Sequence, residues 1–329
     1  MSTDSEINSY IQNPKELLKS YIQGLKSTDV YIQGLKSTDF GVRQEALLAL
    51  SLVGPSAKEA VPLLIQALED ENKGIRINAA RALGVVGAAS PEVVAPLVKA
   101  LKDENISVRC NAIGALGSQL LITSVLLTAL IEVLQYDKEA RVRTNAAIVL
   151  GHFGAGAQTA VPALVEALQE EDETVRRHIV FTLGQVGTAS VDVLAALTKA
   201  LKDKSKIVHM SAIAALGNLR PVTSTSVTAI TESLSCKDAG IRANAATTLG
   251  KLGLQASSAV PALIEALQDE NEIVRQRATR ALQEISETES GANQDVPKGN
   301  VSQQVKEQEM SFESIKREIP NLTDKNFGA

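Results

Sequence analysis

Residues 142–168 read VRTNAAIVLGHFGAGAQTAVPALVEAL, and residues 241–267 read IRANAATTLGKLGLQASSAVPALIEAL. The Val-Arg or Ile-Arg dipeptide that opens each stretch recurs along the chain in steps of 33 or 34 residues. It stands at positions 42, 75, 108, 142, 175, 241 and 274, with Val208-His209 in the remaining place. A fixed period of this length is typical of a repeat array, whose units cannot bury their apolar surface alone. We therefore predict stacked repeats with an extended surface instead of one closed core.

Each unit contains two predicted helices. In the first helix the apolar residues lie one position before the repeat arginine and three, four and seven positions after it, which is the period of a helix and not of a strand. In the fourth unit these residues are Val142, Ala146, Ala147 and Leu150. The second helix is expected to open at a proline, where a missing N–H costs little. These prolines are Pro62, Pro162 and Pro261.

The ends of the first helix carry their own signals. Four residues before the repeat arginine stand Asp39, Asn72, Asn105, Glu139, Asp172, Ser205, Asp238 and Asn271. All but the glutamate are good N-cap residues, because their short side chains accept hydrogen bonds from free backbone N–H groups. The helix is expected to end near a glycine in the left-handed conformation. The candidates are Gly54, Gly87, Gly154, Gly187 and Gly253.

Composition narrows the class of function. The formal net charge is −5, and acidic residues accompany basic ones in every unit, so no long basic stripe is available for a phosphate backbone. The first ten residues are polar and acidic, unlike a secretory signal, and no apolar run is long enough for a membrane span. Two cysteines in different units match no disulfide framework. We expect a cytoplasmic protein that binds no nucleic acid and has no transmembrane segment.

Residues 39–285 resemble HEAT repeats, specifically the short type of phycobilisome-lyase-like proteins from cyanobacteria. This resemblance implies an all-α, right-handed α-solenoid of about seven helix pairs plus capping helices. It also implies a ladder between successive units, formed by an acidic residue and the arginine six positions later. The matching pairs are Asp70 with Arg76, Asp103 with Arg109, Asp137 with Arg143, Glu170 with Arg176, and Asp269 with Arg275.

The ladder pattern is interrupted in two successive units. His209 stands where an arginine is expected, and Cys236 stands where an aspartate is expected before Arg242. The same region replaces its closing glycine with Arg220-Pro221. We interpret residues 203–242 either as a hinge or specialised site, or as an ordinary repeat whose sequence has drifted.

One column of the second helix is the candidate partner-binding surface. HEAT proteins line their concave surface with second helices, so the resemblance implies that a protein partner binds there. The column contains Gln66, Lys99, Glu132, Glu166, Lys199, Glu232 and Glu265. Its mixed, net acidic character suits a partner with basic and polar patches. The alternative is a solvated face with no binding role.

Catalytic signals are weak. The histidines at 152, 178 and 209 lie in different units without a His-Glu pair, and no phosphate loop or nucleophile motif is present. We therefore expect no metal and no resident cofactor. The resemblance allows one enzymatic alternative, a bilin lyase or bilin-detaching factor, with Cys110 and Cys236 as weak candidates for holding a bilin. The preferred function is a non-catalytic scaffold or assembly factor for the photosynthetic antenna or a cofactor-assembly pathway.

The two ends of the chain differ from the array. Residues 1–38 are expected to cap it, and they contain the segment YIQGLKSTD twice, at 21–29 and 31–39. The second copy leads directly into the first repeat, so it is assigned the capping helix. Residues 286–329 read as a flexible tail, because the sequence after Ile285 is polar and rich in Gly and Pro. Within it, residues 303–319 form a potential short amphipathic helix that either binds a partner, docks onto this chain or stays disordered.

Overall fold

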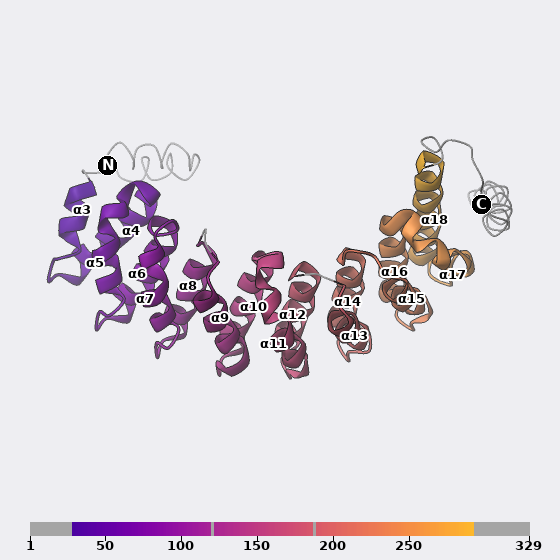
Figure 1. Cartoon of the computed structure of the whole chain (residues 1–329), viewed down its shortest axis with the longest axis horizontal. Helices are drawn as coiled ribbons and strands as arrows, with labels where there is room; N and C mark the ends of the chain where they lie inside the picture. The colour runs from indigo at the N-terminus through magenta and orange to yellow at the C-terminus, as the bar shows by residue number, and fades with distance from the viewer. Residues whose placement is uncertain (1–27, 120–121, 187–188, 293–329) are drawn as a thin grey trace, which may run out of the picture. The chain divides into compact units, whose positions relative to one another are not determined.

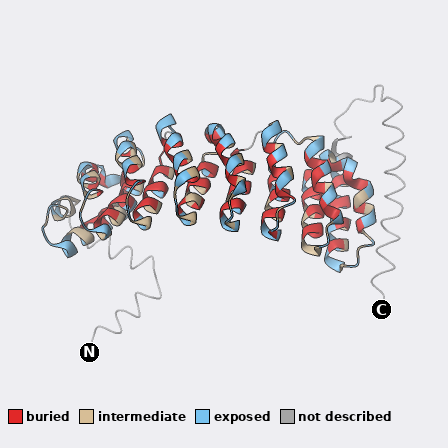
Figure 2. Ribbon diagram, turned by 90° about the horizontal axis from the view of Figure 1, so that it is seen from below, coloured by how far each residue is buried: buried red, intermediate tan, exposed pale blue. Residues whose placement is uncertain are grey.

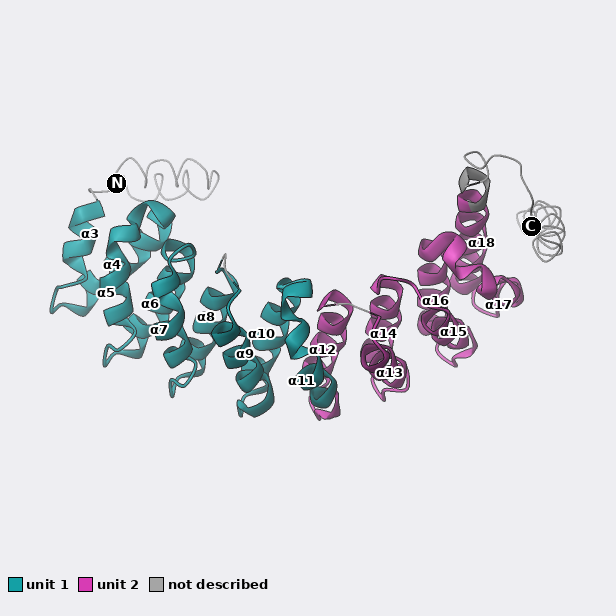
Figure 3. Cartoon of the chain, in the orientation of Figure 1, with its two compact units in different colours: residues 1–167 teal, residues 168–329 magenta. Residues whose placement is uncertain are grey.

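The structure is a computed structural model that describes residues 28–119, 122–186 and 189–292. Within these ranges the chain is helical throughout and contains no β-strand (Figure 1). It divides into two compact units, residues 1–167 and 168–329, which are described separately (Figure 3). The predicted all-α solenoid fold is confirmed, because helix pair follows helix pair in both units.

The described part of the first unit contains one short helix followed by four helix pairs. Helix α3 (Thr28–Gly34) packs against the first helix of the array. The pairs are α4 (Phe40–Val53) with α5 (Val61–Ala67), α6 (Lys73–Val86) with α7 (Val94–Ala100), α8 (Ile106–Gly117) with α9 (Ser124–Tyr136), and α10 (Ala140–His152) with α11 (Val161–Glu166). First helices pack against the next first helix, as α4 does on α6 and α6 on α8.

Up to Ala292, where the described residues end, the second unit contains three helix pairs and one long helix after them. The pairs are α12 (Glu173–Val186) with α13 (Val191–Ala200), α14 (Lys206–Asn218) with α15 (Ser224–Glu232), and α16 (Ala239–Leu252) with α17 (Val260–Ala266). The final helix α18 (Glu272–Ala292) packs against both α16 and α17. It therefore covers the apolar side of the last pair.

Apolar burial between neighbouring helices forms the core (Figure 2). The four positions predicted from the helical period in the fourth repeat, Val142, Ala146, Ala147 and Leu150, are all fully buried. Full burial of a leucine or valine side chain contributes about 1.5–3 kcal/mol, and alanines let the helices approach closely. The array is thus held by many small contributions between neighbours.

The predicted helix ends are largely confirmed. All seven short N-cap side chains accept a backbone N–H, as Asn105 does from Ser107 and Asp238 from Ile241, whereas Glu139 makes no such bond. Gly54, Gly154 and Gly253 adopt the left-handed φ that closes the first helix. Gly87 is an exception, because its φ of −98° lies outside that region. Gly187 lies outside the described residues.

Glycines inside the first helices mark close helix crossings. A Cβ on Gly84 would lie 3.0 Å from the Ala115 Cα, and one on Gly184 would lie 2.9 Å from the Ala215 Cα. The backbones of successive first helices therefore approach each other at these positions. This explains why a residue that costs about 1 kcal/mol in a helix interior recurs there.

We expect Gly84→Ala to lower the free energy of unfolding by up to about 2 kcal/mol. Overpacking costs about 1–3 kcal/mol, which exceeds the gain of about 1 kcal/mol in helix propensity. Gly114→Ala is the matched control, because a Cβ there meets nothing within 4 Å and should stabilise the protein by about 1 kcal/mol. Denaturant unfolding measures both changes, and a stabilised Gly84→Ala variant would disprove the close crossing.

One helical stretch in the first unit resembles a membrane span by length and composition alone. This stretch is Phe40–Ala67. Gly54, with φ of 70°, interrupts it between α4 and α5, and Leu47, Leu50 and Leu64 are fully buried in the protein. The stretch is therefore a core helix pair, and the described residues contain no clear transmembrane segment.

The ends of the array differ in part from the prediction. The second YIQGLKSTD copy supplies most of α3, the turn after it and the N-cap Asp39, whereas residues 1–27 lie outside the described part. Helix α18 runs to Ala292, past the predicted end of the array at Ile285. The Thr288 hydroxyl accepts a hydrogen bond from the Leu254 backbone N–H at 3.1 Å, which ties this extension to the last pair. The segment 303–319 is not among the described residues.

Candidate functional site

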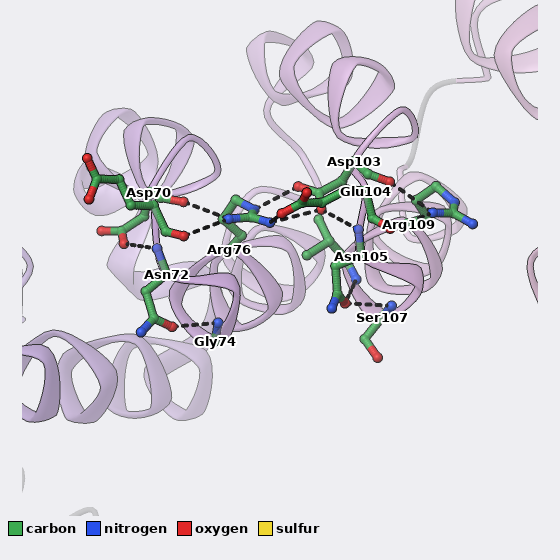
Figure 4. A network of polar contacts seen from close by, with 11 residues as sticks. Asp70, Asn72, Gly74, Arg76, Asp103, Glu104, Asn105, Ser107 and Arg109 are labelled. Atoms are coloured by element: carbon green, nitrogen blue, oxygen red, sulfur yellow. Dashed lines mark hydrogen bonds and ion pairs between the residues drawn. The ribbon is translucent and has the colours of Figure 1, made fainter.

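Arginine–aspartate ion pairs connect successive repeats. Arg76 donates from Nε and Nη2 to the Asp103 carboxylate of the next repeat, at 2.7 and 3.1 Å (Figure 4). Its Nη1 donates to the backbone carbonyls of Asp70 and Glu71, which precede its own helix, at 3.0 and 3.1 Å. One guanidinium therefore joins the turn before its helix to the turn that follows in the next repeat.

Each ladder carboxylate thus binds the arginine of the preceding repeat. It does not bind the arginine six positions later in the sequence. The Asp70 backbone carbonyl accepts a hydrogen bond from Arg76. Its carboxylate lies 3.3 Å from Arg43 of the preceding repeat. Three further arginines bind the next repeat's carboxylate from Nε: Arg109 to Asp137 at 2.7 Å, Arg176 to Asp203 at 2.7 Å, and Arg242 to Asp269 at 2.6 Å. We call these five pairs the inter-repeat ladder.

The remaining predicted ladder residues are Arg143, Arg275 and Glu170. They take part in hydrogen bonds between an arginine side chain and the backbone carbonyls of the turn before its helix. Arg143 and Arg275 donate from Nη1 to the carbonyls of Asp137 and Asp269, both at 2.8 Å. The Glu170 carbonyl accepts from Arg176 at 2.9 Å. The arginine therefore clamps the turn before its own helix in each of these repeats.

The ladder carboxylate of Asp269 is stabilised in its charged form. The hydrogen bond from Arg242 is the largest cause that lowers the pKa of Asp269 below its ordinary value. The same bond raises the pKa of Arg242. Both side chains are about nine-tenths buried, so water screens this pair only weakly.

The interruption of the ladder has a distinct geometry. His209 is buried, and its Nε2 lies 3.3 Å from the Ser233 Oγ in place of an aspartate. Burial lowers the pKa of His209, so the ring is neutral at neutral pH. Cys236 keeps only the backbone role, because its carbonyl accepts from Arg242 at 2.8 Å. The repeats on either side of this point are therefore joined without an ion pair between these two positions.

Sequence reasoning identified the interruption but missed Ser233. This residue occupies a position where neighbouring repeats have alanine, as at Ala200 and Ala266. A polar residue in an alanine column, in the same repeat as the lost arginine, was the available signal.

All seven residues of the second-helix column are exposed in the structure: Gln66, Lys99, Glu132, Glu166, Lys199, Glu232 and Glu265. In the first unit, polar contacts connect this column to the adjacent second-helix segment. Lys99 pairs with Glu69 at 2.6 Å, and Gln135 donates to Glu166 at 3.0 Å. Lys102 lies 3.5 Å from Glu132. The column is thus solvated, charged and continuous with its neighbours within the unit.

Two grooves lie beside second helices of the first unit, near ladder aspartates. A polar groove of about 730 Å³ lies between the turn after α3 and helix α5, where Lys36, Gln66 and Asp70 contribute to its lining. A smaller one of about 160 Å³ lies between α7 and α9, next to Glu132 and Tyr136. Both contain one column residue and one ladder aspartate, so the column borders grooves in the surface of the first unit.

The cysteines do not form a common site. Cys110 lies in the first unit and Cys236 in the second, and each is partly buried. Burial is the largest cause that raises the pKa of both thiols. Within residues 28–119, 122–186 and 189–292, no three His, Cys, Asp or Glu side chains are grouped so that they could hold a metal ion.

A family model described as HEAT repeats matches most of the chain. Its matches cover residues 28–117, 61–150, 127–217, 161–235 and 227–293. The chain belongs to the HEAT-repeat family. This match does not distinguish the predicted phycobilisome-lyase-like branch from other HEAT-repeat proteins. No curated protein sequence matches the chain.

Solved structures share the fold at low sequence identity. An engineered protein matches at 22% identity and a TM-score of 0.51, over 87% of this chain and 86% of that chain. The Escherichia coli protein YibA matches at 20% identity and a TM-score of 0.56, over 83% and 96% of the two chains. A structure of Kap95p with RanGDP matches at 14% identity and a TM-score of 0.58, over 87% of this HEAT-repeat chain but only 42% of the other.

Proposed function

We propose that this HEAT-repeat protein is a non-catalytic scaffold or assembly factor that binds a protein partner on the exposed faces of its second helices. The observation that carries the proposal is the second-helix column, because all seven of its residues are exposed while residues beside them are buried. Repeat arrays of this kind present extended surfaces that suit macromolecular partners. The mixed, net acidic column suits a partner surface with basic and polar patches.

Charge reversal within the column tests this proposal. Glu132→Lys combined with Glu166→Lys should lower the association rate by about tenfold at low salt and weaken its salt dependence, because both carboxylates attract a basic partner surface. Glu59→Lys with Glu92→Lys is the matched control, since it makes the same charge change at exposed positions outside the column. Surface plasmon resonance with the partner measures both, and equal effects of the two double variants would disprove the column's role.

The proposal extends to the kind of partner. The resemblance of the repeats to the phycobilisome-lyase-like type supports a cytoplasmic partner from the photosynthetic antenna or from a cofactor-assembly pathway. Affinity capture from native lysate, followed by identification of the bound protein, tests this extension. A partner from neither pathway would remove it and leave the binding surface itself in place.

The geometry gives less support to the bilin lyase alternative. A thiolate is the reactive form of cysteine, and burial raises the pKa of both Cys110 and Cys236. The two thiols also lie in different units. We propose that the protein works without a resident cofactor, and absorbance of a stably bound bilin after mixing would contradict this.

A further inference from the structure

Two successive turns of the second unit carry a lysine at a position where four other repeats carry a glutamate. The residue five positions before the repeat arginine is acidic in several repeats and turns toward the preceding ladder arginine. Glu104 lies 3.3 Å from Arg76, and Glu270 lies 3.5 Å from Arg242. Lysines stand in this position at 204 and 237, and further lysines stand at 202 and 206. All four side chains are exposed, and we call the two turns that carry them the basic turn pair.

The two turns are adjacent in the fold. Lys206 Nζ lies 2.8 Å from the Asp238 carboxylate of the next turn, and helices α14 and α16 pack against each other. The Asp203 carboxylate is bound by Arg176 at 2.7 Å, and Asp238 pairs with Lys206, so the net positive charge of the two turns comes from Lys202, Lys204 and Lys237. The N-termini of α14 and α16 add partial positive charge at the same place. The basic turn pair therefore concentrates positive charge on one edge of the second unit.

The first of these turns also lacks its arginine clamp. Arg176 and Arg242 donate from Nη1 to the carbonyls of Glu170 and Cys236 in the turns before their helices. His209 takes this place in its repeat, and its ring contacts Ser233 instead. The backbone of residues 203–206 is thus less tightly tied to its own helix than in the neighbouring repeats. The turn can adjust to a bound segment at lower cost.

We propose that the basic turn pair docks an acidic, extended segment of a partner protein. Packed helices lie about 8–10 Å apart, and an extended chain in the polyproline II conformation advances about 3.1 Å per residue with three residues per turn, so every third side chain lies on one face. Carboxylates about three residues apart would therefore reach Lys204 and Lys237 together. The surface differs in charge from the acidic second-helix column and goes beyond the proposed function, because it takes partner chemistry of the opposite charge.

A protein segment fits this surface better than a nucleic acid does. Exposed Glu171 and Glu173 precede the basic turn pair along the second unit, and exposed Glu270 and Glu272 follow it. A phosphate backbone long enough for tight electrostatic binding would meet these carboxylates on both sides. A short acidic peptide can bind between them.

Fluorescence anisotropy with a labelled peptide that carries glutamate at every third position tests the proposal on the full chain. The unmodified protein should bind this peptide, and affinity should fall as salt rises. Lys204→Glu with Lys237→Glu should weaken binding by about tenfold, because two attractive pairs become repulsive. Lys204→Gln with Lys237→Gln should weaken it less. Both positions, 204 and 237, are exposed, and circular dichroism checks that the two double variants keep their helix content.

Lys138→Glu is the matched control, because Lys138 holds the same repeat position in the first unit without lysines on either side. It should leave peptide binding unchanged, as should Glu132→Lys with Glu166→Lys in the second-helix column. The proposal is overturned if the unmodified protein does not bind the peptide, or if Lys138→Glu weakens binding as much as the paired reversal. Tighter binding of a single-stranded oligonucleotide of equal charge would also overturn it.

Discussion

Arg109→Ala is expected to lower the free energy of unfolding by about 3–5 kcal/mol, because removal of one member of a buried ion pair leaves the other charge uncompensated. The Asp137 carboxylate, only 8% exposed, would lose two hydrogen bonds, at 2.7 and 3.0 Å. The carbonyls of Asp103 and Glu104 would lose their donor as well. The change therefore weakens both the turn before α8 and its connection to α10.

Hydrogen exchange of the amides in α8, α9 and α10 is the most direct measurement, since a repeat array can open locally before it unfolds globally. Denaturant unfolding gives the total loss. Arg81→Ala is the control, because Arg81 is exposed and bonds only to Asn78 of its own helix, and its effect should stay within about 0.5 kcal/mol. If Arg109→Ala costs no more than Arg81→Ala, the ladder does not join the repeats energetically.

The interrupted position of the ladder offers the second large effect. His209→Arg alone should destabilise the protein, because it places a cation at a buried position where Cys236 provides no carboxylate. Adding Cys236→Asp should restore a standard ion pair, with a favourable coupling of about 2–3 kcal/mol between the two changes. Cys236 already has the extended backbone of a ladder aspartate, with φ −67° and ψ 149° against −68° and 132° at Asp137.

A double-mutant cycle by denaturant unfolding gives this coupling directly. The single variants and the double variant differ only at these two positions, so each serves as a control for the others. Additive effects within about 0.5 kcal/mol would show that the two side chains do not pair. In that case residues 203–242 would be more than a drifted repeat that has lost its ion pair.

The sequence predicted those parts of the fold that depend on local chemistry. The N-cap at Asn105 and the proline that opens α11 could be read directly, because each satisfies backbone groups within a few residues. The left-handed glycines at 54, 154 and 253 followed from the same reasoning. Gly87 did not, because the loop after it adopts a different path before the short helix Pro91–Val93.

Features that depend on contacts between repeats were harder to predict. A spacing of six residues suggests that Asp103 pairs with Arg109, yet its carboxylate binds Arg76 and only its carbonyl binds Arg109. Three-dimensional stacking decides which repeat supplies each half of the contact. The extension of α18 was missed for the same reason, because the role of Thr288 depends on Leu254 in the preceding pair.

The candidate site was predictable only as a column of charged residues. The repeat period placed Gln66, Lys99 and Glu132 at the same position of successive second helices, and the structure shows that each is exposed. The grooves beside the column could not be predicted, since they depend on the distance between successive second helices. The basic turn pair with Lys204 and Lys237 could not be predicted either, because it depends on the packing of two adjacent turns.

Hydrogen–deuterium exchange on the protein with and without its captured partner tests the central claim most directly. The account predicts that the partner slows exchange in the second helices of the array, at peptides that contain Glu132, Glu166 and Glu232. First helices such as α6 and α8 should exchange at the same rate in both samples. Protection confined to the first helices, with the second helices unchanged, would contradict recognition through the second-helix column.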